Sequence, residues 1–122
     1  ESTPDGLRLV CREGDPGIAI DRIRQPIEPG PYVLSFRLRT NGDRDGEVFF
    51  TVDPKITLPR GERIAFEPIN DRQWHEVRIP IKTDKSIVAL RLDVCGGEGE
   101  ATIANLKLLD QNDKTLREWK SD

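Results

Sequence analysis

The stretch YVLSFRLRT, residues 32–40, decides the fold class of this chain. Its large apolar side chains fall on every second position: Tyr32, Leu34, Phe36 and Leu38. The positions between them include Arg37 and Arg39. A period of two is typical of a β-strand that turns one face to the core and the other to water. The stretch therefore predicts a sheet with one solvated face.

The same alternation recurs along the chain, in short segments separated by Gly, Pro, Asn and Asp. The further candidate strands are residues 7–11, 17–20, 47–52, 63–67, 74–81, 87–94, 101–109 and 115–119. In 87–94 the inward positions are expected to be Val88, Leu90, Leu92 and Val94, and an irregularity is expected in 101–109 near Ile103 and Ala104. No segment has the spacing of an amphipathic helix.

Two local signals predict how particular strands are placed. Asn41-Gly42 and Asp45-Gly46 directly follow residues 32–40, and such dipeptides favour a β-hairpin with residues 47–52. Pro80 has no N–H to donate to a neighbouring strand, so the strand that contains it is expected at a sheet edge or a bulge.

These patterns predict one domain, residues 1–122, with an all-β fold: an antiparallel, jelly-roll-like β-sandwich of eight or nine strands. The length of 122 residues suits a single domain. An immunoglobulin-like sandwich is the alternative, but the buried Trp between two strand cysteines is not evident.

Composition excludes several classes of partner. The net charge of −3 gives no basic field for nucleic acid, and no apolar run is long enough to span a bilayer. We therefore expect neither nucleic acid nor a membrane as partner. The chain starts at Glu1 without a Met or a signal-peptide pattern, so we expect a mature product or a domain excised from a larger protein.

The residues offer little catalytic chemistry. His75 is the only histidine, and no GxSxG or related nucleophile motif accompanies it, so we interpret it as a half-buried strand histidine. Two of the acids Glu47, Glu67, Glu76 and Asp93 could form a glycosidase pair, but 22 acidic and 19 basic residues favour a solvated charge lattice. We predict no catalytic residues.

Cysteines and acidic loops leave two questions open. Cys11 and Cys95 are either buried free thiols or a disulfide. Residues 41–46 (NGDRDG) imitate the first half of a calcium loop, but Val52 stands where a bidentate Glu belongs, so a polar turn is the preferred interpretation. We predict no metal site and no cofactor, and leave open a structural calcium ion held by carboxylates such as Asp110 or Asp113.

The solvated side of the predicted sheet carries the candidate ligand-binding residues. They are Arg37, Arg39, Phe49, Trp74, Arg78 and Arg91. Guanidinium groups bind sulfate and carboxylate groups in a bidentate manner, and aromatic rings stack on sugar faces. If the strands are neighbours, this face suits an acidic polysaccharide. The alternative is that Arg and Glu side chains pair across strands and only keep the face soluble.

Four stretches carry a family resemblance: residues 30–40 (GPYVLSFRLRT), 46–50 (GEVFF), 73–80 (QWHEVRIP) and 87–93 (IVALRLD). Together they resemble the accessory β-sandwich domain that lies C-terminal to the catalytic domain in planctomycete-type bacterial sulfatases, and carbohydrate-binding-module-like domains more generally. The resemblance spans roughly residues 30–110. The sulfatase signature, a Cys or Ser followed by x-P-x-R, is absent, and Cys11-Arg12-Glu13 does not match it.

The resemblance implies a non-catalytic accessory domain of a sulfatase or another carbohydrate-active enzyme, in the periplasm or secreted. It implies a polysaccharide ligand and a catalytic domain in the same chain as partners. The alternative function is a structural or interaction domain that packs against its catalytic neighbour and binds no sugar. A small jelly-roll enzyme is a third alternative.

Overall fold

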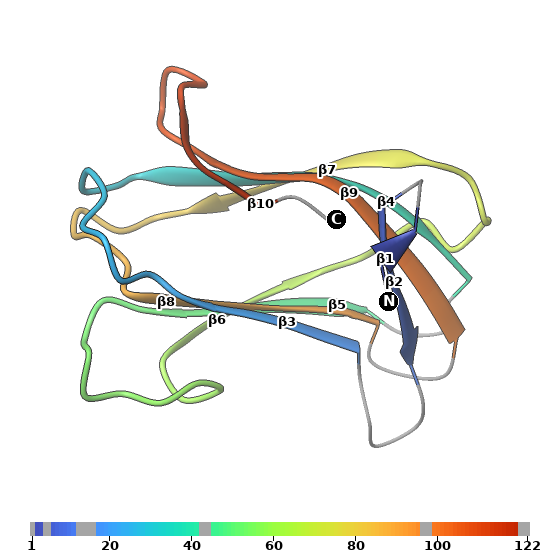
Figure 1. The fold of residues 1–122 in the computed structure, drawn as a ribbon, viewed down its shortest axis with the longest axis horizontal. Helices are drawn as coiled ribbons and strands as arrows, with labels where there is room; N and C mark the ends of the chain where they lie inside the picture. The colour runs from blue at the N-terminus through green and yellow to red at the C-terminus, as the bar shows by residue number, and fades with distance from the viewer. Residues whose placement is uncertain (1, 4–5, 12–16, 42–44, 96–98, 120–122) are drawn as a thin grey trace.

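Two antiparallel sheets pack face to face in the computed structural model, which describes residues 2–3, 6–11, 17–41, 45–95 and 99–119 (Figure 1). The first, here called the β4 sheet, contains β1 (Ser2–Thr3), β2 (Gly6–Cys11), β4 (Tyr32–Thr40), β7 (His75–Ile81), β9 (Gly99–Leu109) and β10 (Thr115–Trp119). The second, the β8 sheet, contains β3 (Gly17–Arg22), β5 (Gly46–Thr51), β6 (Glu62–Phe66) and β8 (Ala89–Cys95).

The strand order confirms the predicted sandwich. The β4 sheet runs β1-β2-β9-β4-β7, with β10 also paired to β9, and the β8 sheet runs β3-β8-β5-β6. Among the described residues there is no helix, and hence none that could cross a membrane. All nine predicted strands are present, and the two-residue β1 is additional. The jelly-roll assignment stays a prediction, with which this strand order is compatible.

Each sheet turns alternate residues inward, as the sequence pattern predicts. The largest fully buried side chains are Tyr32, Leu34, Phe36, Val48, Ile81, Ile87, Leu92, Val94 and Leu108. One inward assignment is wrong by a residue: Ile87 is buried while Val88 is only partly so, because β8 begins at Ala89 and the preceding segment follows a different path. Pro80 lies on β7, the edge strand of its sheet, as predicted.

The predicted hairpin between residues 32–40 and 47–52 is wrong. Strand β4 pairs with β7 and β9, whereas β5 belongs to the opposite sheet and pairs with β6 and β8. The connection therefore crosses between the layers. Its residues 42–44, part of the imitated calcium loop, lie outside the described residues. Strands on facing sheets bury alternate residues just as strands in one hairpin do, so the local pattern does not distinguish the two arrangements.

An irregularity in β9 falls close to the predicted place. Ser35 pairs with Lys107 and Arg37 with Ala104, so the register shifts across Asn105, whose φ is 56°. Asn tolerates this left-handed conformation better than most residues, and an extra residue bends the strand locally. The bulge lets β9 pair with β2 along its first half and with β10 along its second half.

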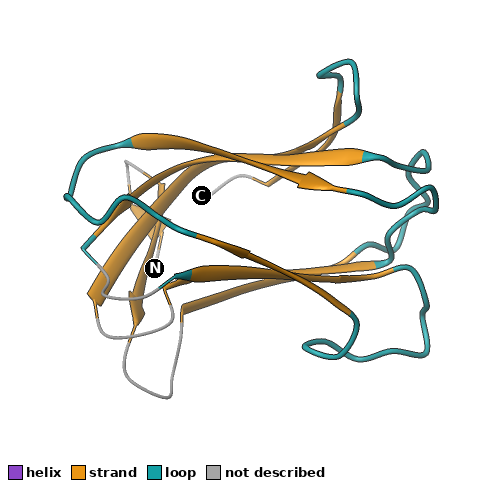
Figure 2. Cartoon of the chain, turned by 180° about the vertical axis from the view of Figure 1, so that it is seen from behind, coloured by secondary structure: helices purple, strands orange, loops and turns teal. Residues whose placement is uncertain are grey.

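Loops at the two ends join the layers (Figure 2). At one end the buried Tyr32 hydroxyl donates to the carbonyl oxygens of Glu28 (2.6 Å) and Lys85 (3.2 Å), which ties together the loops before β4 and before β8. Burial raises the pKa of the Tyr32 phenol above its ordinary value of 10.0. The phenol is therefore a neutral hydrogen-bond donor at physiological pH.

Candidate functional site

The most distinctive group on the surface is formed by two arginines and a tryptophan on the outer face of the β4 sheet. Arg37 and Arg39 project from alternate positions of β4, and Trp74 immediately precedes the neighbouring strand β7. The Cζ atoms of Arg37 and Arg39 lie 5.0 Å and 4.7 Å from the centroid of the Trp74 ring. Both distances fall within the range of cation–π attraction. We call this group the Arg37–Trp74–Arg39 cluster.

Trp74 is held in place by a short, hydrogen-bonded loop. The carboxylate of Asp71 accepts the Gln73 backbone N–H at 2.9 Å and lies 2.9 Å and 3.0 Å from the Nε2 atom of His75. The Arg72 N–H donates to the Thr40 carbonyl at 3.1 Å, which attaches the loop to the end of β4. The Gln73 N–H, and then His75, lower the pKa of Asp71 below its ordinary value of 3.8.

The guanidinium of Arg37 is available to a ligand. Its side chain is exposed, and no carboxylate among the described residues forms an ion pair with it. Its partner across β7 is Glu76, whose carboxylate instead lies 3.8 Å from Arg78. A guanidinium that stacks on a ring keeps its in-plane N–H donors free, so Arg37 can present a bidentate donor pair to an oxyanion.

Arg78 lies on the same face, but its charge is already paired. It donates to Asp113 at 2.7 Å and approaches Glu76 at 3.8 Å. Asp110, the other acid considered for calcium, accepts the N–H groups of Asn112 and Lys114 and so shapes the turn before β10.

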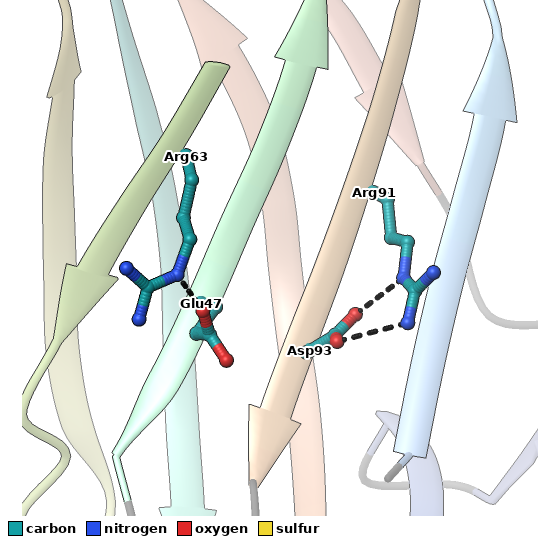
Figure 3. Close-up of polar contacts among 4 residues, drawn as sticks. All are labelled: Glu47, Arg63, Arg91 and Asp93. Carbon is teal, nitrogen blue, oxygen red and sulfur yellow. Dashed lines mark hydrogen bonds and ion pairs between the residues drawn. The ribbon is translucent and has the colours of Figure 1, made fainter. Parts of the chain in front are cut away.

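The prediction that all six candidate residues share one face is wrong, because Phe49 and Arg91 lie on the outer face of the β8 sheet. They face each other across β5 and β8, with the Arg91 Cζ atom 5.3 Å from the Phe49 ring centroid. Arg91 is also bound to Asp93 through two hydrogen bonds, of 2.8 Å and 3.1 Å (Figure 3). The Arg91 guanidinium is therefore already paired with a carboxylate of its own strand, β8.

The outer face of the β8 sheet forms a charge ladder in which the acids already have partners. Glu47 stands opposite Asp93, as a catalytic dyad would require, and Glu47 accepts a hydrogen bond from Arg63 of β6 (Figure 3). Asp93 is only 6% exposed. Each carboxylate therefore has an arginine partner, as a charge lattice requires, but Asp93 is buried and not solvated as predicted.

The remaining polar candidates have structural partners. His75 is partly buried at the start of β7, and its ring bonds to Asp71. The side chain of Asn41 accepts the Glu100 N–H at 2.8 Å and so links β4 to β9. Among the described residues, no group of three or more His, Cys, Asp or Glu side chains could hold a metal ion. Cys11 and Cys95 lie on opposite sheets, but their side chains are outside the described part of the chain, so their pairing stays open.

Sequence reasoning missed Asp71, which positions Trp74. The Asn70-Asp71 dipeptide indicates a turn, but nothing local shows that its carboxylate reaches His75.

Comparisons of the chain with protein-family models, with curated proteins and with solved structures gave no match in any of the three. The fold and the arrangement of side chains are therefore the basis for the functional proposal.

Proposed function

We propose that this chain is a non-catalytic, carbohydrate-binding-module-like accessory domain that contacts an acidic glycan through the Arg37–Trp74–Arg39 cluster. The observation that carries the proposal is the exposed Arg37 guanidinium, stacked on Trp74 and without an ion-pair partner among the described residues. The ligand group is a sulfate or a uronate, because each offers two oxygens to a guanidinium fork.

The membership of a sulfatase chain and the periplasmic or secreted location rest on the sequence resemblance alone. Phe49, Arg78 and Arg91 are no longer part of the proposed site, because Arg78 and Arg91 are paired and Phe49 lies on the other sheet. The alternative, a domain that only packs against a catalytic neighbour, predicts no glycan binding at this face.

Binding is expected to be weak and sensitive to salt. Few contacts on an open sheet leave little free energy after the cost of association. Exposed charges are screened beyond about 10 Å at 0.1 M ionic strength.

The test compares dextran sulfate with unmodified dextran by affinity electrophoresis and calorimetry, because the two polymers share a backbone and differ in charge. Polygalacturonate, measured in the same way, tests whether the site binds the carboxylate groups of a uronate. Arg37→Gln should weaken binding about tenfold, as expected for the loss of a charged hydrogen bond worth ~1.5–3 kcal/mol. Arg78→Gln removes the same charge from the same face and should change the affinity less than about twofold, because Arg78 is already paired.

Two results would reject the cluster as the site. One is equal weakening by Arg37→Gln and Arg78→Gln, which would indicate attraction to net charge alone. The other is the absence of binding to any acidic polymer at low salt, which would favour the packing alternative.

A further inference from the structure

A cavity of about 330 Å³ opens at the end of the sandwich away from Trp74. Residues from both sheets line it: Phe50, Thr51 and Val52 at the end of β5, Asp53 and Ile56 in the following loop, Gly61 and Glu62 at the start of β6, and Lys82 and Thr83 after β7. Since β7 starts beside Leu38 and ends beside Tyr32, the cavity and the Arg37–Trp74–Arg39 cluster occupy opposite ends of this strand. The two sites are therefore separate.

The loop wall of the cavity is ordered by its own hydrogen bonds. The Thr51 hydroxyl accepts the Asp53 N–H at 3.0 Å, and one Asp53 carboxylate oxygen accepts the Lys55 N–H at 2.9 Å. Gly61 has a φ of 119°, and a Cβ there would lie 2.7 Å from the Phe50 carbonyl oxygen. The loop thus returns directly against β5, at a distance that only glycine allows without a shift.

The other wall, which belongs to the β4 sheet, is ordered as well. The Thr83 N–H donates to the Ile81 carbonyl at 3.2 Å, and the Thr83 hydroxyl accepts the Lys85 N–H at 3.3 Å. A cavity with both walls hydrogen-bonded in place needs little reorganisation to receive a ligand, which reduces the entropic cost of binding.

The charged side chains that line the cavity do not form ion pairs with one another in the part of the chain that the structure describes. Glu62 and Lys82 both line it, yet neither forms an ion pair with any other residue in the part of the chain that the structure describes. Asp53 adds a second carboxylate, so the lining carries two acids and one base. The apolar part of the lining comes from Phe50, Val52 and Ile56.

We propose that this cavity binds one neutral sugar ring. The volume lies at the lower end of the range of about 300–1,000 Å³ for small-molecule sites, so one ring fits it better than a chain. A hydroxyl group both donates and accepts, so a polyol can satisfy the carboxylates of Asp53 and Glu62 and the ammonium of Lys82 together. The C–H face of the ring packs on the apolar part of the lining, and the excess of acid disfavours a uronate.

The site does not depend on the acidic-glycan proposal, and one NMR experiment distinguishes the two. Glucose, galactose, mannose and glucuronate are titrated separately into the ¹⁵N-labelled 122-residue chain. At least one neutral hexose should give saturating shifts confined to residues 50–62 and 81–85, with a dissociation constant in the millimolar range, because so small a ligand has few atoms to contribute. Glucuronate should bind several-fold more weakly.

Two variants and two controls make the test specific. Glu62→Gln and Lys82→Gln should each weaken hexose binding at least fivefold, and both positions are exposed, so the fold should be retained. Lys85→Gln removes an exposed ammonium group from the same end, outside the cavity lining, but keeps the backbone N–H that donates to Thr83, and should leave binding unchanged. Arg37→Gln should also leave it unchanged, even if that variant abolishes binding of dextran sulfate.

Three results would overturn the proposal: no saturable shift with any neutral hexose, shifts centred outside the cavity, or equal losses in Lys82→Gln and Lys85→Gln. None of them bears on whether dextran sulfate binds at Arg37.

Discussion

Replacing Asp93 with alanine should destabilise the sandwich by about 3 kcal/mol, because it leaves the Arg91 guanidinium without its carboxylate in a mostly buried place. The Asp93 and Arg91 side chains are only 8% and 15% exposed, and two hydrogen bonds of 2.8 Å and 3.1 Å join them. Removal of one partner from a buried pair costs ~3–5 kcal/mol. We expect the lower end, because Arg91 lies over Phe49 and is not wholly shielded from water.

The matched control is Arg63→Ala on the same face of the same sheet. Arg63 pairs with Glu47, but its side chain is 60% exposed, so the loss should be at most ~1 kcal/mol. The double variant Arg91→Ala with Asp93→Ala should lose less than the sum of the two single variants, since it leaves no unpaired charge.

Urea denaturation followed by circular dichroism measures all five proteins: the parent, Asp93→Ala, Arg91→Ala, Arg63→Ala and the double variant. The midpoints are comparable if the slope m is unchanged, because a change in m signals a change in the surface exposed on unfolding. The reasoning is refuted if the free energy of unfolding of Asp93→Ala lies within ~1 kcal/mol of that of the parent protein. It is also refuted if the losses of stability in Arg91→Ala and Asp93→Ala add up to the loss in the double variant.

Tyr32→Phe should lower the free energy of unfolding by ~1–3 kcal/mol in the same assay, because it removes the hydroxyl donor to the Glu28 carbonyl, while the Lys85 carbonyl keeps the Gly30 N–H at 3.4 Å; a loss below ~0.5 kcal/mol would contradict this. In the parent protein the pKa of Tyr32 is raised, so the stabilisation by the neutral phenol should be complete below about pH 10 and be lost progressively as the pH rises beyond it. The free energy of unfolding of both proteins, measured at increasing alkaline pH, checks this. Asp71 has a lowered pKa, so its support of the Trp74 loop should be complete above its ordinary value of 3.8 and lost as the pH falls below it. The Trp74 indole N–H resonance should report that transition, and Asp71→Asn should abolish it; an unchanged transition in the variant would assign it to another group.

The strands and their inward faces could be predicted from the sequence because alternation is a property of each strand alone. Residues 32–40 bury Tyr32, Leu34, Phe36 and Leu38 as the pattern requires, and the edge position of Pro80 follows from its missing N–H. The residue at which a strand begins could not be predicted in this way, as Ile87 and Val88 show. The path of the chain before a strand depends on contacts with other segments, which the alternation does not encode.

The pairing of strands could not be predicted in the same way. Asn41-Gly42 and Asp45-Gly46 favour a hairpin locally, yet the chain crosses to the other sheet there. Long-range pairing, such as that of β4 with β7 and β9, decides which layer each strand joins. The candidate site depended on this choice: Arg37, Arg39 and Trp74 come together because β7 lies beside β4, and the same topology removes Phe49 and Arg91 to the opposite face.

By itself, therefore, the sequence determined that the chain is an all-β sandwich, most of the residues that form its core, and which arginines project from the outer faces of the sheets. Only the tertiary structure decided which of those arginines remain available. Arg37, Arg78 and Arg91 occupy equivalent outward positions in their strands, but only Arg37 lacks a carboxylate partner among the described residues. The physical reason is that an ion pair depends on the few ångströms between two side chains, and strand order sets that distance across the sheet.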